Sequence, residues 1–232
     1  MKLLPLEALQ KTGPVDHADW NYKPVLGWIQ RLRFDLVLRL MKSHHYRRIL
    51  EIGYGSGVFL PELARHCDQL YGVDVHPRQA EVQATLATLG VKAELHCSGA
   101  ESLPFDNEFF ECVVVVSALE FVSDLERVCQ EAERVLAPGG RMIVITPGAS
   151  PVLDFGLKVL TGKSAEEDFG GRRAAIVPTL ERWFTVEKVQ TFPPVGHSMI
   201  CVYRALDCRR RGTSASYSKN EQPKSEQRLV GV

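Results

Sequence analysis

The sequence predicts an α/β protein with a doubly wound, mostly parallel sheet of seven strands and helices on both faces. Three observations support this prediction. Short apolar segments alternate with segments of helical periodicity, a turn with glycine at every second position follows the first strand, and an acidic residue ends the second strand. Such alternation is typical of parallel sheets whose strands are connected by helices.

The predicted strands are short apolar segments. The longest uncharged apolar run, at residues 112–119, is too short to cross a bilayer and indicates a buried strand. We expect five strands at residues 48–52, 69–75, 93–97, 111–119 and 141–147, and two further strands at about 184–191 and 197–205.

The first predicted helix covers residues 25–41, where apolar side chains recur at helical intervals. Three basic side chains interrupt this pattern, and we expect the helix to pack on the core with Arg31, Arg33 and Arg39 in solvent. The alternative is a helix that lies on a membrane surface. Nearby aromatic residues either anchor this helix, which we favour, or line an apolar pocket: Trp20, Tyr22 and Trp28.

Three more helices are predicted. One follows the glycine turn and contains Phe59, and another lies near residues 173–183. The third occupies the segment 123–140, where Ser123 and Glu126 form a capping-box pattern and Pro-Gly-Gly ends the helix.

The composition is that of an ordinary globular protein. There are 28 Lys and Arg against 28 Asp and Glu, so a net charge of zero gives no argument for nucleic acid or an anionic membrane as a partner. Pro5 and Glu7 interrupt the apolar start before a secretory segment can form. We therefore expect a soluble, cytoplasmic protein with no transmembrane segment and no nucleic-acid partner.

The six cysteines are scattered through the sequence, with no CxxC pair and no metal-ligand spacing. Most of them lie in apolar segments, which indicates reduced, buried thiols. We expect no metal site.

Three regions are predicted along the chain. Residues 1–47 form a helical segment that packs on the core and borders the site of a second substrate, and residues 48–207 form the α/β domain. Residues 208–232 are mostly polar and basic, which predicts a disordered tail.

The glycine turn, together with the strands and helix around it and the acid that ends the second strand, predicts a nucleotide site. Gly53, Gly55 and Gly57 let the backbone approach a ligand, and Asp74 at the end of the second strand can accept hydrogen bonds from ribose hydroxyls. A dinucleotide fingerprint would need glycine or alanine at the position of Val58. A nicotinamide oxidoreductase is therefore disfavoured, and the absence of a P-loop lysine disfavours triphosphate binding.

Three motifs resemble the class I S-adenosylmethionine-dependent methyltransferases, type 11 group. "LEIGYGSG" looks like that family's ExGxGxG motif, "LYGVDV" like its ribose-binding motif, and the segment from "GAESLPF" to "LAPGG" like its middle section. The resemblance covers about residues 48–147 and implies a Rossmann-like methyltransferase fold, with S-adenosylmethionine as cofactor and a small-molecule acceptor. "AESLPF" is also similar to the quinone-biosynthesis C-methyltransferases, a motif shared too broadly to fix a substrate.

The resemblance implies roles for single residues. The glycines would line the methionine and ribose side of the cofactor, Glu51 would organise its amino end, and Asp74 would hold the ribose hydroxyls. Further cofactor contacts are implied for Val75, Gly99, Ala100 and Ser117.

Two positions depart from the family pattern. The family commonly has an aspartate at the position of Gly99, where it binds the adenine amino group, so that bond is missing unless Glu101 replaces it. Glu120 stands where the family often has a histidine. It is a candidate to take a proton from the acceptor, and a solvated glutamate beside a helix start is the alternative.

The resemblance implies direct displacement of a methyl group from a sulfonium by an oxygen, nitrogen or carbon nucleophile. The rival interpretation is a methyltransferase-like protein that binds the cofactor or a partner without catalysis, for which Gly99 is the main support.

Overall fold

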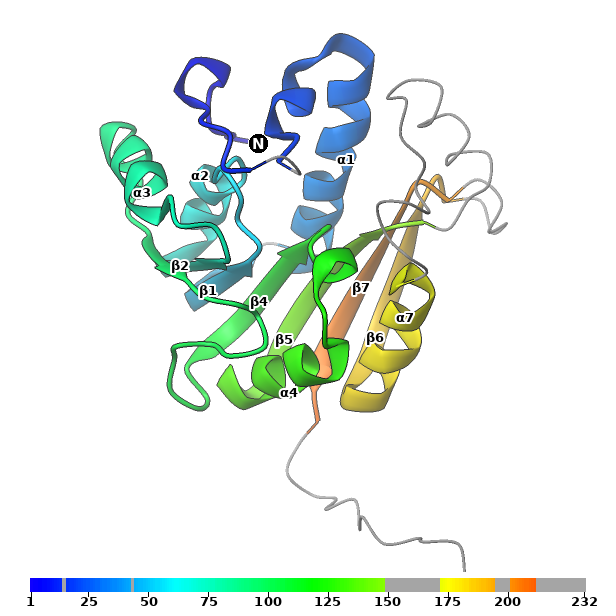
Figure 1. The fold of residues 1–232 in the computed structure, drawn as a ribbon. Helices are drawn as coiled ribbons and strands as arrows, with labels where there is room; N and C mark the ends of the chain where they lie inside the picture. The colour runs from blue at the N-terminus through cyan, green and yellow to red at the C-terminus, as the bar shows by residue number, and fades with distance from the viewer. Residues whose placement is uncertain (14–15, 43, 149–171, 195–200, 212–232) are drawn as a thin grey trace, which may run out of the picture.

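The computed structural model describes residues 1–13, 16–42, 44–148, 172–194 and 201–211. They form a seven-stranded sheet in the order β3-β2-β1-β4-β5-β7-β6, in which β7 is antiparallel to both of its neighbours (Figure 1). The predicted fold class is therefore confirmed. The strands are β1 (Tyr46–Ile52), β2 (Cys67–Asp74), β3 (Glu94–Cys97), β4 (Phe110–Val116), β5 (Leu136–Pro147), β6 (Phe184–Phe192) and β7 (Tyr203–Arg210).

Helices cover both faces of the sheet. Neighbouring strand residues such as Val113 and Val114 point to opposite faces and belong to separate apolar clusters. One cluster includes side chains of α1, α2 and α3, and the other includes side chains of α4 and α7 (Figure 1). The helices are α1 (Pro24–Met41), α2 (Leu60–Leu63), α3 (Gln79–Thr88), α4 (Leu125–Val135) and α7 (Arg172–Trp183).

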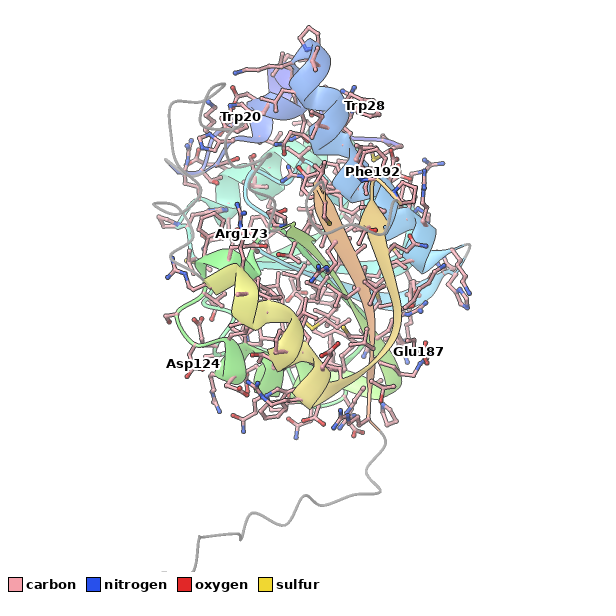
Figure 2. All side chains as sticks on the ribbon, turned by 90° about the vertical axis from the view of Figure 1, so that its right-hand side faces the viewer. Trp20, Trp28, Asp124, Arg173, Glu187 and Phe192 are labelled. Carbon is pink, nitrogen blue, oxygen red and sulfur yellow. The ribbon has the colours of Figure 1, made fainter. Side chains whose placement is uncertain are left out.

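The segment before β1 packs on the sheet through α1. Phe34 of α1 stacks on Phe59 with ring centroids 4.4 Å apart, and both rings are buried. Trp28 of α1 is 56% exposed and contacts Phe192 edge to face at the end of β6 (Figure 2). β1 begins at Tyr46, so the predicted boundary at residue 47 falls inside this strand.

The last strand differs from its prediction. It was expected at residues 197–205, whereas β7 occupies Tyr203–Arg210; residues 197–200 lie outside the described part of the chain. The predicted tail therefore starts too early. Cys208 is fully buried, Arg209 and Arg210 lie in the strand because their backbones pair with β5 and β6, and their side chains also pair with Glu187 and Glu108. Residues 212–232, the rest of the predicted tail, lie outside the described residues.

The start of α4 also differs from its prediction. Asp124, not Ser123, caps the helix, and its Oδ1 accepts a hydrogen bond of 3.0 Å from the backbone N–H of Arg127. Ser123 donates instead to Oε1 of Glu101, from both its backbone N–H and its hydroxyl. The helix ends at Val135, and β5 begins with the next residue.

The helix α3 was not predicted from the sequence. It buries two side chains, Val82 and Leu86, and its remaining residues are half-buried or exposed, so its apolar periodicity is weak. Five of the six cysteines are buried and Cys97 is exposed. Within the described ranges, none of the helices is both long and apolar enough to span a membrane.

Candidate functional site

The site lies at the carboxyl ends of the central parallel strands. β1 pairs with β2 on one side and with β4 on the other, so the chain reverses its winding direction at β1. Loops that follow strands at such a reversal leave a crevice between them, where open α/β sheets bind their ligands. The predicted glycine turn directly follows β1 and lies at this crevice.

Positive φ angles explain the three glycines of the turn. Gly53, Gly55 and Gly57 have φ angles of 78°, 53° and 76°, a region that residues with a Cβ rarely adopt. A Cβ on Gly53 would also lie 2.5 Å from the Cβ of Ala118, in the loop after β4. Glycine is therefore needed here for backbone conformation and for the close approach of two loops.

Asp74 connects the end of β2 to the glycine turn. Its Oδ2 accepts a hydrogen bond of 2.8 Å from the backbone N–H of Gly55, and its Oδ1 lies 3.4 Å from the backbone N–H of His76. The imidazole of His76 in turn lies 2.9 Å from the carbonyl oxygen of Gly55. A carboxylate has about four acceptor positions, so Asp74 keeps capacity for ligand hydroxyls.

The loop after β3 lies beside the end of β2. The backbone N–H of Ser98 donates to the carbonyl oxygen of Asp74 at 2.9 Å, which places Gly99 and Ala100 next to this strand end. Ala100 is buried, whereas Val75 is 74% exposed. An added Cβ on Gly99 would lie 3.0 Å from Oε2 of Glu101. The Glu101 carboxylate therefore occupies the space next to Gly99.

Glu51 is one of two buried carboxyl groups in this region. It is 3% exposed at the end of β1, and its Oε2 is buried without a hydrogen-bond partner among the described residues. Burial raises the pKa of Glu51 to about 8, although the charge of Arg33 acts in the opposite direction. An unpartnered buried carboxyl oxygen is costly, so Glu51 is a candidate to bind a polar ligand group.

Ser117 directly follows β4, at the same end of the sheet as the glycine turn. It has a positive φ of 52°, and its backbone N–H donates to the carbonyl oxygen of Ile145 at 2.8 Å. Its hydroxyl oxygen is buried and finds no partner within the described ranges. Backbone strain together with an unpartnered polar group is typical of functional sites.

Glu120 is fully buried, which excludes the solvated alternative. It lies in a short 3₁₀ helix, Leu119–Phe121, and its Oε1 accepts a hydrogen bond of 2.5 Å from the hydroxyl of Thr146 on β5. Oε2 has no partner among the residues that the structure describes. Burial raises the pKa of Glu120 above its usual value, and the charges of Arg173 and Arg33 oppose this shift.

Four residues of this region were not identified from the sequence as site residues. Tyr54 and His76 pack edge to face with ring centroids 5.0 Å apart, and Nε2 of His76 lies 2.9 Å from the carbonyl oxygen of Gly55 in the turn. Thr146 donates a hydrogen bond to Glu120, and Arg33 of α1, which was predicted in solvent, is half-buried with a buried Nε. The position of Tyr54 inside the glycine motif was a usable signal, whereas the other three depend on tertiary contacts.

Comparison with known families agrees with this geometry. Residues 50–144 match the family model described as "Methyltransferase domain", type 11. This segment is a class I methyltransferase domain of the type 11 group. The matched residues include β1, the glycine turn, Asp74 and the loop that follows β4.

Relatives of this methyltransferase domain match over part of the chain. The ubiquinone/menaquinone biosynthesis C-methyltransferase UbiE of Haemophilus ducreyi is 31% identical over 114 residues, which are 47% of this chain and 44% of that protein. The chain spans about half, or less, of the length of the curated relatives it matches.

Solved structures show that the methyltransferase fold extends beyond the matched segment. The N-methyltransferase NodS of Bradyrhizobium japonicum, in complex with S-adenosyl-L-homocysteine, has a TM-score of 0.58 at 19% identity, covering 78% of this chain and 86% of that one. The [4+2]-cyclase SpnF has a TM-score of 0.62 at 18% identity, covering 79% and 81%. At these identities the likeness concerns the fold, which also supports chemistry other than methylation.

Proposed function

We propose that this protein is an S-adenosylmethionine-dependent methyltransferase that acts on a small-molecule acceptor. The hydrogen bond between Asp74 and Gly55 is the observation that carries the proposal, because it holds a carboxylate of suitable chemistry for ribose at the rim of the glycine turn. The buried, unpartnered oxygen atoms of Glu51 and Ser117 fit a ligand with polar groups at its inner end.

The residues present fit the cofactor as follows. Asp74 would accept hydrogen bonds from the ribose hydroxyls, and Glu51 would receive the methionine ammonium group. Val75, with its exposed side chain, would pack on the adenine ring, and the backbone N–H of Ala100 would bond to that ring. The glycine turn would let the backbone lie against the ligand, and Ser117 would border the methionine part.

S-adenosylmethionine, when bound, supplies a methyl group that is already activated as part of a sulfonium. The protein then has to hold the acceptor in line with this group and exclude water, and alignment alone can contribute about 7–11 kcal/mol. A base is required where the nucleophile of the acceptor carries a proton.

Glu120 would hold and remove that proton. Its Oε1 is fixed by the hydroxyl of Thr146, and its Oε2 is free to accept an O–H or N–H group of the acceptor. When the acceptor is methylated, the Glu120 carboxylate would take up the proton that the acceptor loses. Burial raises the pKa of Glu120 toward the range in which a general base works well.

The experiment compares binding and transfer in one preparation. Wild-type protein should be stabilised against heat by S-adenosylhomocysteine and not by NAD, and it should transfer methyl groups from labelled S-adenosylmethionine to a member of a panel of hydroxyl, amine and quinone-like acceptors. Stabilisation by NAD alone would refute the assignment.

A second candidate is a cofactor-binding protein of this fold without methyl transfer, and Gly99, at the position where the family commonly has an aspartate, is the observation that favours it. It predicts stabilisation by S-adenosylhomocysteine and no labelled product with any acceptor. Glu120→Gln tests methyl transfer separately from cofactor binding. The glutamine still accepts the hydrogen bond of the Thr146 hydroxyl, but it cannot take up a proton from the acceptor. It should retain S-adenosylhomocysteine affinity and reduce transfer to a protonated acceptor by about 10²–10⁴-fold.

A further inference from the structure

A cavity lies at the carboxyl end of β5, where this strand meets the first turns of α7 and the start of β7. Its volume is about 260 Å³. Pockets for whole drug-sized ligands have about 300–1,000 Å³, so this cavity has room for one end of a small molecule. Among the described residues that line it, Arg173 and Arg204 are basic and none is acidic. The lining therefore favours a negatively charged group.

Arg204 reaches the cavity from the sheet. It lies on β7 directly opposite Thr146 of β5, which also lines the cavity. Leu206, two residues further along β7, packs in the apolar cluster that includes side chains of α7, and alternate residues of a strand share a face. Arg204 is half-buried and makes neither an ion pair nor a side-chain hydrogen bond with the residues that the structure describes. Its five N–H groups are therefore available to a ligand.

Arg173 approaches the same cavity from the first turn of α7 (Figure 2). Its Nη1 lies 3.4 Å from the carbonyl oxygen of Gly148, which holds the guanidinium near the end of β5. Two guanidinium groups on one small cavity repel each other, and an anion between them offsets that repulsion. A guanidinium also binds a carboxylate or a phosphate through two parallel hydrogen bonds. An oxyanion is therefore the group that suits both side chains.

The loop after β4 connects this cavity to the glycine turn. At its start, Ala118 lies so close to Gly53 that a Cβ on the glycine would come within 2.5 Å of the alanine Cβ. Two residues further on, Glu120 accepts its hydrogen bond of 2.5 Å from Thr146, and Thr146 lines the cavity. The loop therefore contacts the glycine turn at one end and the wall of the cavity at the other.

We propose that this cavity binds an oxyanion group of the acceptor, a carboxylate or a phosphate, through Arg204 and Arg173. The inference rests on the proposed function, because it names the chemical class of the acceptor for the same site. The acceptor is then a small molecule with two functional ends. One end carries the nucleophile, next to Glu120, and the other carries the oxyanion, in the cavity.

The test uses three probes with one phenyl ring and different head groups: benzoate, phenyl phosphate and the neutral benzamide. Each probe is titrated calorimetrically, at constant ionic strength, into the full chain with and without saturating S-adenosylhomocysteine. The proteins are wild type, Arg204→Met, Arg204→Lys and Arg173→Met. Arg47→Met is the matched control, because Arg47 is an exposed strand arginine at the amino end of β1. Thermal unfolding of each variant without ligand shows whether it is folded.

Wild type should bind benzoate or phenyl phosphate, and it should bind benzamide at least about 10-fold more weakly. The anion that binds more tightly tells carboxylate from phosphate. Arg204→Met should weaken anion binding by roughly 10- to 100-fold, and Arg204→Lys should lose less because it keeps the charge. Arg173→Met should also weaken the anions, and Arg47→Met should change nothing.

Two results overturn the inference. One is equal affinity of wild type for the three probes, which includes binding of none of them. The other is anion affinity that survives unchanged in folded Arg204→Met. If Met at position 204 unfolds the protein, Arg173→Met carries the same comparison.

A competition experiment connects the cavity to the acceptor. With labelled S-adenosylmethionine and an acceptor that the protein methylates, the bound anion should raise the KM of that acceptor and leave kcat unchanged. Anion binding without competition would overturn the inference, because the cavity would then be separate from the acceptor site. The failure of the proposed function has a different signature: S-adenosylhomocysteine does not bind and no acceptor is methylated, whatever residue stands at position 204.

Discussion

The backbone N–H of Gly55 donates a hydrogen bond of 2.8 Å to Oδ2 of Asp74. This bond joins two loops that follow neighbouring parallel strands, so one carboxylate both shapes the glycine turn and presents its remaining oxygen positions to the crevice. Asp74 is therefore expected to matter for the shape of the glycine turn as well as for ligand binding.

Asp74→Ala should weaken S-adenosylhomocysteine binding by about 1–3 kcal/mol, because ribose hydroxyls in the site lose their acceptor. Calorimetry measures the change. Asp68→Ala is the matched control, since Asp68 lies on the same strand, is exposed and pairs with His45. Unchanged affinity in Asp74→Ala, or an equal loss in both variants, would contradict the assigned role.

Glu51 should make the stability of the ligand-free protein depend on pH. Burial raises its pKa to about 8 in the folded chain, above that of a free glutamate, so the folded state holds its proton over a range in which the unfolded state has lost it. The stabilising contribution is complete at acidic pH and is lost as the pH rises through about 8.

Glu51→Gln should remove this dependence. Urea unfolding of wild type between pH 5 and 9 should show a decrease in unfolding free energy, with a slope of at most about 1.4 kcal/mol per pH unit from this group. The variant should show a flatter profile and should equal or exceed wild type in stability at pH 9. Parallel profiles for the two proteins would show that Glu51 is ionised in the folded state throughout.

Gly99 and Glu101 should act as one unit. A side chain at position 99 would begin 3.0 Å from Oε2 of Glu101, and a second carboxylate there would repel the first. Gly99→Asp should therefore leave S-adenosylhomocysteine affinity equal or lower, although the same aspartate is common in the family. Combined with Glu101→Ala, it should bind more tightly than Glu101→Ala alone.

A double-mutant cycle over these two positions measures the coupling. Residues in contact usually give an interaction free energy of about 0.5–3 kcal/mol, whereas independent positions give nearly additive changes. If the effects of Gly99→Asp and Glu101→Ala on binding are additive, Glu101 does not replace the aspartate that the family commonly has at position 99.

Two truncations should locate the end of the fold. Removing residues 212–232 should leave thermal stability and ligand binding intact, because this sequence has few apolar side chains to bury. Removing residues 208–232 should lower the melting temperature by several degrees, because it deletes the buried Cys208 and the pairs of Arg209 with Glu187 and of Arg210 with Glu108. Equal melting temperatures for the two truncated proteins would show that the end of β7 does not contribute to stability.

The fold class, the glycine turn and the acid at the end of β2 could all be predicted from the sequence. These features are local: a strand buried on both faces is a continuous apolar run, and a turn with positive φ angles requires glycine. Both signals occupy a few consecutive residues, so spacing was sufficient to place Gly53, Gly55, Gly57 and Asp74 at one site.

The burial and the partners of the charged side chains became visible only in the tertiary structure. From the sequence, Glu120 could be either a solvated glutamate or a catalytic one. Arg33 was expected in solvent, and Arg209 and Arg210 were assigned to a tail. Each outcome depends on partners far away in sequence, such as Thr146 for Glu120 and Glu187 for Arg209. Burial and pairing set the ionisation and position of a charged side chain, and no pattern of neighbouring residues specifies which distant atoms will surround it.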